Sequence, residues 1–471
     1  MKYFLIFILF VFNIHLISAQ VFDVDTIKFA GPSDKRINLV ILSEGYQTAE
    51  LPQFITDATS LSNDMFNQSP FSEYADYFNV FAINVPSMDS GADHPGTATD
   101  VVEPFTPITT VDTYFNATFD AFNIHRLLYY GIDYTDAAAA DAKIRSVLAD
   151  NFPTYDQALI IVNTNVYGGT GGEFPMASTL ANDIAIHELG HSLFKLQDEY
   201  YAGDEYPSEA INMTQENDPN LIKWKNWNGT NGIGIYAHSG TPIAATWYKP
   251  QSGGQCKMEA LNVAFCSVCK EGIIEKIHSL VSPIDSYTPV SNTISNPSFP
   301  LEFQLSLIKP IPNTLESSWS LNASNFATNV DDVSVLDTDL NTGLNNLTAV
   351  ITDNTALLKV TNHETVHVYT VTWTIDYSTL GVKDIETDVN NLTITMHPNP
   401  ANTTANFKID SDRGANLKVE VISLDGKKVK TVPMYNHQTQ QVNISSLSEG
   451  IYVANFYADN VLVASKKLVK Q

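Results

Sequence analysis

The chain has 471 residues, of which 44% are hydrophobic and 17% are charged, and its formal net charge at pH 7 is −26. This length is sufficient for three folded domains. Such strong acidity argues against nucleic acid or an anionic membrane surface as a partner. The acidic residues show no EF-hand spacing, so no motif supports a Ca²⁺ site.

The N-terminal residues have the pattern of a secretory signal peptide. Lys2 precedes the apolar run 4–12, and residues 17–19 (ISA) end in the small side chains of a cleavage site. We therefore expect residues 1–19 to be a signal peptide that is cleaved after Ala19. No later stretch reaches the length that a membrane helix requires, so we expect no membrane span.

Residues 20–282 alternate between strand and helix patterns. Residues 37–42 and 157–163 are short, continuous apolar runs, which are typical of central strands covered on both faces. Residues 51–67 and 136–150 are predicted to form amphipathic helices. This alternation predicts an α/β domain.

The pentad His187–His191 (HELGH) matches the H-E-x-x-H motif. Residues four apart lie on the same face of a helix, so His187 and His191 can hold one Zn²⁺ ion. Glu188 follows the first ligand and can take a proton from a water that the zinc activates. A helical apolar pattern surrounds the pentad and favours this interpretation over a chance match: Leu180, Ile184, Ala185, Ile186, Leu189 and Leu193.

A catalytic zinc usually takes three protein ligands, so a third is needed. We predict that Asp198 is this ligand, with Glu199 as the alternative, because either carboxylate could turn back to the metal if the helix ends near Gly203. The structural alternative is that both acids only carry surface charge.

The run His187–Tyr200 resembles the signature of the IgA-peptidase family of zinc metallopeptidases, metallopeptidase family sixty-four, in which H-E-x-G-H is followed by Leu and then D-E-Y. Further segments resemble that family in the same order: 37–46, 54, 70–71, 78–85, 167–169 and 256–269. The resemblance covers about residues 30–280, and it implies a metzincin-like zinc peptidase domain. Metzincins have their third ligand six residues after the second His, where this chain has Gln197, a poor ligand.

Three further features have candidate roles, the first two through the same resemblance. Met258 would form the Met-turn beneath the zinc, although a lone Met is more often core filling. Residues 168–172, with four glycines, would be a flexible loop entering an edge strand at 173–179 that pairs with extended substrate, and an ordinary turn-rich loop is the alternative. Three tyrosines are candidate donors to an oxyanion, or simple packing residues: Tyr200, Tyr201 and Tyr248.

The three cysteines are Cys256, Cys266 and Cys269. In an exported protein we expect one disulfide and one leftover thiol, with Cys256 paired to Cys266 or Cys269. A structural zinc site is the alternative, but three thiolates would need an unidentified fourth ligand.

The C-terminal half has two β patterns. Residues 283–385 alternate apolar and polar side chains between turns, which predicts an Ig-like β-sandwich with Trp319 and Trp373 in its core. After a linker at 386–395, residues 396–471 also read as a small β-sandwich.

Residues 396–471 resemble the C-terminal sorting domain of type IX secretion through HPNP, LDGK, GIY and KKLVK. The resemblance implies that the type IX secretion machinery carries the protein through the periplasm to the cell surface or the medium. An ordinary fibronectin-like accessory module is the alternative.

Together these patterns predict a secreted zinc endopeptidase. His187, His191 and Asp198 would hold one Zn²⁺ ion, and Glu188 would be the general base for hydrolysis of extracellular protein or peptide substrates. The alternative is a catalytically silent surface-binding or adhesion protein on a metallopeptidase scaffold. The substrate cannot be predicted from these residues.

Overall fold

The computed structural model of the protein describes residues 20–204, 206–295, 297–361, 367–378, 385–386, 392–411 and 416–471. The predicted signal peptide at 1–19 and residues 387–391 of the predicted linker lie outside the described residues. None of the described helices is long and apolar enough to cross a membrane.

The chain forms two compact units. The first comprises Met1–Val290, Glu302–Val333 and Thr348–Val371, and the second comprises Ser291–Leu301, Ser334–Leu347 and Thr372–Gln471. The division between them falls within the segment predicted to be Ig-like.

A six-stranded sheet of the first unit has the order β1-β3-β2-β4-β6-β5. The strands are β1 (Val24–Lys28), β2 (Ile37–Glu44), β3 (Phe78–Ile83), β4 (Gln157–Val162), β5 (Gly169–Thr170) and β6 (Met176–Ser178). Neighbours among β3, β2, β4 and β6 are parallel, whereas β1 and β5 are antiparallel edge strands. The predicted α/β arrangement is therefore confirmed for this region.

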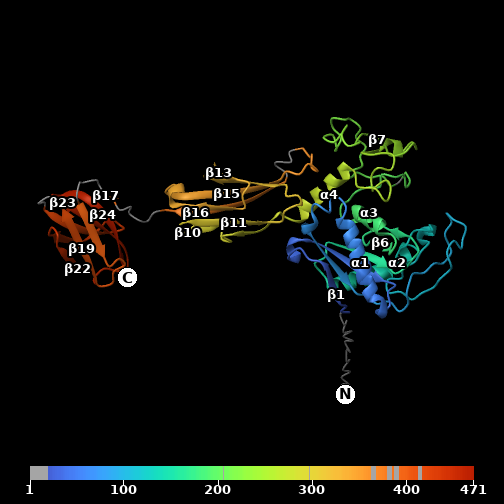
Figure 1. The fold of residues 1–471 in the computed structure, drawn as a ribbon, viewed down its shortest axis with the longest axis horizontal. Helices are drawn as coiled ribbons and strands as arrows, with labels where there is room; N and C mark the ends of the chain where they lie inside the picture. The colour runs from blue at the N-terminus through green and yellow to red at the C-terminus, as the bar shows by residue number, and fades with distance from the viewer. Residues whose placement is uncertain are drawn as a thin grey trace, which may run out of the picture. The chain divides into compact units, whose positions relative to one another are not determined.

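Both faces of this sheet are covered. The helices of this region are α1 (Leu51–Phe66), α2 (Tyr134–Asn151), α3 (Asn182–Ser192) and α4 (Ser267–Leu280). Successive side chains of a strand point to opposite faces. Leu39 and Ile41 of β2 accordingly join a core with α1, α3 and α4, whereas Val40 and Leu42 join a core with α2. Figure 1 shows α1, in blue, and α3 close together beside the sheet, and contacts between these two helices bear this out.

Two strands, β7 (Tyr236–Ala237) and β8 (Tyr248–Lys249), pair within the long segment between α3 and α4. A β-rich region then follows α4. It contains a five-stranded sheet, β10-β16-β15-β12-β13, and a three-stranded sheet, β14-β11-β9. The strands are β9 (Ile284–Thr288), β10 (Thr293–Ser295), β11 (Leu301–Leu307), β12 (Leu315–Leu321), β13 (Ser324–Thr328), β14 (Asp332–Val335), β15 (Gly343–Asp353) and β16 (Val368–Tyr377). Trp319 and Trp373 are fully buried, as predicted. The Ig-like assignment itself stays a prediction.

The C-terminal strands form a five-stranded sheet, β17-β24-β23-β20-β21, and a three-stranded sheet, β18-β19-β22. Their bounds are β17 (Ile385–Glu386), β18 (Leu392–His397), β19 (Thr404–Ser411), β20 (Leu417–Ser423), β21 (Lys428–Met434), β22 (Thr439–Asn443), β23 (Gly450–Ala458) and β24 (Val461–Lys470). The GIY motif begins β23 and the KKLVK motif ends β24. These two strands pair from Gly450 with Lys470 onward.

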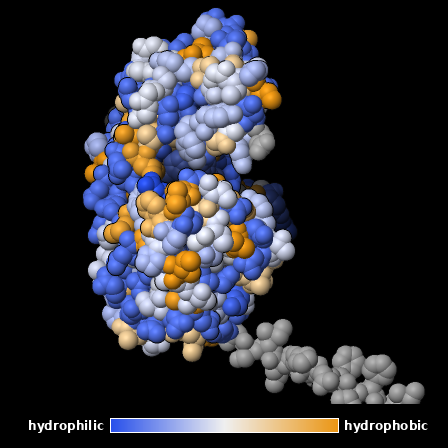
Figure 2. All heavy atoms as spheres, turned by 90° about the vertical axis from the view of Figure 1, so that its right-hand side faces the viewer, coloured by the Kyte–Doolittle hydropathy of each residue, from blue (hydrophilic) through white to orange (hydrophobic). Residues whose placement is uncertain are grey.

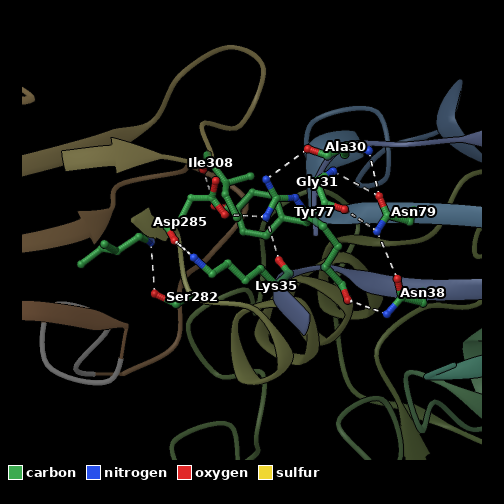
Figure 3. Close-up of polar contacts among 11 residues, drawn as sticks. Ala30, Gly31, Lys35, Asn38, Tyr77, Asn79, Ser282, Asp285 and Ile308 are labelled. Atoms are coloured by element: carbon green, nitrogen blue, oxygen red, sulfur yellow. Dashed lines mark hydrogen bonds and ion pairs between the residues drawn. The ribbon is translucent and has the colours of Figure 1, made fainter. Parts of the chain in front are cut away.

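Polar contacts within the first unit connect its sheet to the start of the β-rich region (Figure 3). Arg36 donates to Asp285 at 2.8 Å, and the Tyr77 hydroxyl donates to the Ile308 carbonyl at 2.8 Å. Asn79 of β3 donates to its neighbour Asn38 at 3.1 Å. These bonds satisfy polar groups that the sheet would otherwise bury.

A buried carboxylate at the end of β15 makes further connections of this kind. Asp353 is fully buried and accepts hydrogen bonds from the Tyr74 hydroxyl at 2.6 Å and from His278 Nε2 at 2.9 Å. Burial alone would raise the pKa of Asp353, but the hydrogen bonds from His278 and its neighbours hold it below its usual range.

We expect Asp353→Ala to lower the free energy of unfolding by about 3–5 kcal/mol, because it leaves buried polar partners without their acceptor. Urea unfolding of the purified protein measures the change. Asp337→Ala, at an exposed position, is the control and should cost less than about 0.5 kcal/mol. Equal stability of the two variants would contradict the network.

Candidate active site

The H-E-x-x-H pentad lies in the second half of α3, whose buried face includes Ala185, Ile186 and Leu189. Asp183 in the first turn of this helix pairs with the buried side chain of Lys257. The apolar face and this ion pair hold the helix against the core, so the two His side chains project from a rigid element.

The expectation that α3 continues to about Gly203 is wrong, because the helix ends at Ser192. Lys195 has a left-handed backbone, φ 59°, and the Leu196 N–H donates back to the Gly190 carbonyl at 2.8 Å. On a continued helix, Asp198 would lie about 10 Å along the axis from His191. The early end instead lets the chain return toward the histidines.

Three side-chain atoms converge where the sequence predicts the zinc ligands. Asp198 Oδ1 is 3.1 Å from His187 Nε2 and 3.1 Å from His191 Nε2. The two Nε2 atoms are 3.2 Å apart. Tetrahedral ligands at zinc–ligand distances of about 2.0–2.1 Å lie about 3.3 Å apart, so this triangle has the size that a zinc ion requires.

Backbone carbonyls hold both imidazoles in the tautomer that a metal needs. His187 Nδ1 donates to the Lys257 carbonyl at 2.8 Å, and His191 Nδ1 donates to the Leu196 carbonyl at 2.8 Å. With the proton on Nδ1, each Nε2 presents a lone pair toward the other ring. The donor set therefore fits a zinc ion, which would remove the repulsion between these lone pairs.

Glu188 lies beside the three donors and faces two cavities. One cavity of about 430 Å³ is lined by Thr170, Gly171, His191, Asp198 and other residues. The other, of about 280 Å³, is lined by Tyr167, Ile184, His187 and Lys257 among others. Leu127, Glu188 and Tyr200 line both.

Burial raises the pKa of Glu188 above its usual range. A carboxylate with a raised pKa that faces a cavity has the properties of a general base.

Figure 2 shows one face of the molecule, which is mostly hydrophilic and is hollowed across its middle.

Among the tyrosines singled out, Tyr200 alone lines these two cavities. Burial and the negative charge of Asp198 raise its pKa, so its hydroxyl keeps its proton and can donate a hydrogen bond. The Tyr248 hydroxyl instead accepts a hydrogen bond from Asn217 at 3.1 Å.

The glycine run has a more specific role than a flexible loop. Gly169 and Thr170 form β5, which pairs with β6 and is one of the two edge strands of the sheet. The expectation of an edge strand at 173–179 is therefore wrong, since β6 lies between β4 and β5. Because glycines have no side chains, this run can lie directly against the active-site helix.

Gly171 leaves no room for a side chain, because a Cβ atom there would lie 2.3 Å from Glu188 Oε2. We expect Gly171→Ala to lower kcat by about tenfold or more by displacing the Glu188 carboxylate, since small misplacements of a catalytic group are costly. Peptide hydrolysis rates measure this effect. Stability should change by less than about 1 kcal/mol, because the flexible end of Glu188 can move aside. An unchanged kcat would show that the Gly171 contact does not position Glu188.

Met258 is fully buried directly beneath α3. A Cβ atom at Gly190 would lie 2.8 Å from Met258 Sδ, so the glycine permits this close contact. The Met258 carbonyl accepts a hydrogen bond from the Glu199 N–H at 2.7 Å. The turn containing Met258 thus supports the ligand segment, as a Met-turn would, and its assignment as a Met-turn stays a prediction.

Glu199 lies away from the triangle of candidate zinc ligands and close to the cysteines. It is fully buried, and its Oε1 lies 3.4 Å from Cys256 Sγ and 3.2 Å from Cys269 Sγ. All three cysteines are free thiols, and Cys256 Sγ is 3.6 Å from Cys269 Sγ, compared with about 2.05 Å in a disulfide. The structure therefore differs from the predicted disulfide, because the thiols converge on a carboxylate.

The structure brings together a further group of potential ligands that the sequence patterns do not predict. His94, Glu103, Asp120 and His125 bring their donor atoms together within 4.8 Å. They lie in the long segment between β3 and α2, where the described regular structure is a short 3-10 helix, Ala121–Asn123. Their spacing matches no motif, so only the presence of two histidines and two acids in one segment could have suggested them.

Comparisons with known proteins agree with the sequence motifs. A search of curated proteins gave no match. Dimeric latent PorU from Porphyromonas gingivalis is 12% identical with a TM-score of 0.15, over 40% of this chain and 20% of that chain. Fibronectin(III)-like modules of Clostridium thermocellum CbhA are 11% identical with a TM-score of 0.14, over 40% of this chain and 91% of theirs.

TM-scores this low support no argument about the fold, and the chain spans about a fifth of PorU. The family models are informative. Residues 26–234 match IgA Peptidase M64, and residues 395–471 match the secretion system C-terminal sorting domain. Both resemblances recognised from the motifs are therefore confirmed: residues 26–234 are similar to the IgA Peptidase M64 family, and residues 395–471 are similar to a type IX sorting domain.

Proposed function

We propose that the protein is a secreted zinc endopeptidase that cleaves extracellular proteins or peptides, with Glu188 as its general base. The observation that carries this proposal is the triangle of His187 Nε2, His191 Nε2 and Asp198 Oδ1, with sides of 3.1–3.2 Å, beside a carboxylate that faces two cavities. The match of residues 26–234 to a peptidase family supports it.

His187, His191 and Asp198 would hold the metal. When bound, a zinc ion there would polarise the scissile carbonyl and make water a stronger nucleophile. Glu188 accepts the proton of the attacking water and later passes it to the leaving amine. The carbonyls of Lys257 and Leu196 orient the imidazoles, and the Tyr200 hydroxyl would donate a hydrogen bond to the developing oxyanion.

The two cavities meet at Glu188, so they would receive the side chains on either side of the scissile bond. The 280 Å³ cavity includes Ile184, Ala260 and Leu261 in its lining and suits an apolar side chain. The 430 Å³ cavity includes Gln197, Ser208 and His238 and suits a polar one.

The proposed organisation of the chain is a signal peptide at 1–19, a catalytic domain at 20–282, an Ig-like sandwich at 283–385, a linker at 386–395 and a sorting domain at 396–471. The match of residues 395–471 to a sorting domain supports the last of these segments and implies export by the type IX machinery. The protein would then act in the medium or at the cell surface.

Metal removal tests the proposal. The purified protein should cleave casein at internal bonds, lose this activity on treatment with phenanthroline, and regain it when zinc is added back. Peptide mapping of the products shows whether cleavage is internal, and circular dichroism checks that the protein stays folded. Zinc at His187 and His191 without cleavage of any protein offered would instead favour a silent binding protein.

A further inference from the structure

We propose that His94, Glu103, Asp120 and His125 form a second metal site, separate from the candidate active site, which binds a zinc ion with a structural role. This proposal does not depend on peptidase activity.

The four side chains form a compact donor set around a common centre. Asp120 Oδ1 is 3.4 Å from His94 Nε2 and 3.5 Å from His125 Nδ1. Glu103 Oε1 is 3.3 Å from His125 Nδ1, and Glu103 Oε2 is 3.8 Å from His94 Nε2. Tetrahedral ligands of zinc lie about 3.3–3.5 Å apart, so the geometry fits one ion.

Each residue of this donor set directs one buried atom without a hydrogen-bond partner toward the others. These atoms are His94 Nε2, Glu103 Oε1, Asp120 Oδ1 and His125 Nδ1. A buried polar atom without a hydrogen bond costs about 1–3 kcal/mol, so four in one place indicate a missing ligand.

Further polar atoms of three of these side chains hold them in this orientation. His94 Nδ1 donates to the Pro107 carbonyl at 3.2 Å, which leaves the lone pair of Nε2 facing the centre. Asp120 Oδ2 accepts from the Thr97 N–H at 2.9 Å, and Glu103 Oε2 accepts from the Phe105 N–H at 2.8 Å. Outer hydrogen bonds that orient ligands in this way are typical of metal sites.

The ligand chemistry identifies the class of metal. Two imidazole nitrogens argue against Ca²⁺ and Mg²⁺, which prefer oxygen ligands in sets of six or more. Two nitrogens and two carboxylate oxygens at tetrahedral spacing suit Zn²⁺. Four protein ligands fill its coordination sphere and leave no position for substrate, so the role is structural.

The position of the site links it to the substrate cavities. His125 directly precedes Arg126 and Leu127, which line the 280 Å³ cavity, and Leu127 also lines the 430 Å³ cavity. The Arg126 carbonyl accepts a hydrogen bond from the Gly169 N–H of β5 at 3.1 Å. A metal held by His125 would therefore fix one wall of the cavities.

Metal analysis of the purified full chain by mass spectrometry tests this site. Glu103→Gln, which preserves side-chain size, and His125→Ala should each lose one equivalent of zinc relative to the wild type. Asp198→Ala should lose a different equivalent, so the double variant His125→Ala/Asp198→Ala should lose two. His397→Ala, an exposed histidine of β18, is the control and should lose none.

Wild-type metal content in both Glu103→Gln and His125→Ala would overturn the proposal. Failure of the proposed peptidase activity would not, because the metal count is read without substrate. Glu103 would tie the segment 95–112 to the metal, so loss of the metal should also speed proteolysis within this segment. An unchanged rate of proteolysis would contradict the structural role.

A different set of residues carries a second proposal. We infer that Glu199, Cys256, Cys266 and Cys269 form a structural zinc site, in which Glu199 is the fourth ligand that the three cysteines alone lack. Their donor atoms lie within 4.8 Å of one another, and all four residues are buried. Glu199 Oε2 is buried without a hydrogen-bond partner. Thiolates and a carboxylate at this spacing suit tetrahedral zinc.

This site would join three segments of the chain. Glu199 follows Asp198, Cys256 lies two residues before Met258, and Cys269 lies in α4. A zinc ion held by Glu199 would thus help to position the adjacent candidate ligand, Asp198.

Titration of the thiols with a mercurial reagent should release one equivalent of zinc from the wild type, and that equivalent should be absent in Glu199→Gln. Asp198→Ala should retain the thiol-released zinc, which separates this site from the candidate active site. An intact mass lower by two hydrogens under non-reducing conditions would reveal a disulfide and overturn the proposal, as would release of no zinc.

Discussion

Glu188→Gln should reduce kcat for peptide hydrolysis by about 10³-fold while the zinc content stays at the wild-type level. Proton transfer by a positioned side chain contributes about 10²–10⁴-fold to a rate, and glutamine cannot accept the proton. The variant keeps the shape of the side chain that faces both cavities. Initial rates on a fluorogenic peptide, with zinc measured on the same sample, give both quantities.

The matched control for this variant is Glu259→Gln, whose carboxylate pairs with Lys249 at 2.5 Å and which also lines the 280 Å³ cavity. It should retain at least about a third of the wild-type kcat, because the carboxylate lies outside the group of His187, Glu188 and His191. If Glu188→Gln kept wild-type activity with zinc bound, Glu188 would not be the base, and the assignment of the reaction would fail.

Asp198→Ala should lower zinc affinity by more than 100-fold and remove hydrolysis under metal-limited conditions. Substitution of a residue that only supports a metal ligand lowers the affinity for the metal by about 10–100-fold, so loss of a direct ligand should lower it further. Asp198 Oδ1 also lies 3.1 Å from His187 Nε2 and 3.1 Å from His191 Nε2. Competition with a zinc-binding dye measures the affinity.

Gln197→Ala is the informative comparison for Asp198→Ala. Gln197 occupies the position where metzincins have their third ligand, but the three atoms that converge belong to His187, His191 and Asp198. Zinc affinity should therefore be unchanged within about twofold in this variant. Strong zinc binding by Asp198→Ala, with weak binding by Gln197→Ala, would exchange the roles of these two residues.

Local patterns were sufficient for two central strands of the sheet, for two helices and for the pentad. The run 37–42 lies in β2, and the run 157–163 matches β4 with its end shifted by one residue. The helices at 51–67 and 136–150 appear as α1 and α2 with ends shifted by at most two residues. These features depend on contacts between near neighbours in the chain, and periodicity records such contacts directly. The spacing of His187 and His191 is of the same kind.

The end of α3 could not be predicted in this way. No glycine or proline follows Ser192 closely, and the turn depends on Lys195 in a left-handed conformation and on a hydrogen bond from Leu196 to Gly190. This conformation is unfavourable for most residues, and tertiary packing must maintain it. The edge of the sheet differs from the prediction for a related reason. The strand β5 lies within the run 168–172, whose glycines predict only a loop, and its pairing with β6 is a tertiary contact.

By itself, the sequence determined the resemblance to the IgA-peptidase family, the mixed α/β layer, the β-rich C-terminal region and the pair of histidines with an adjacent glutamate. Only the tertiary structure decided which of two adjacent acids faces those histidines, that the cysteines gather around Glu199, and that His94, Glu103, Asp120 and His125 meet. Ligands four residues apart are brought together by one turn of helix. Ligands separated by tens of residues meet only through the packing of the whole chain, and no local pattern records that distance.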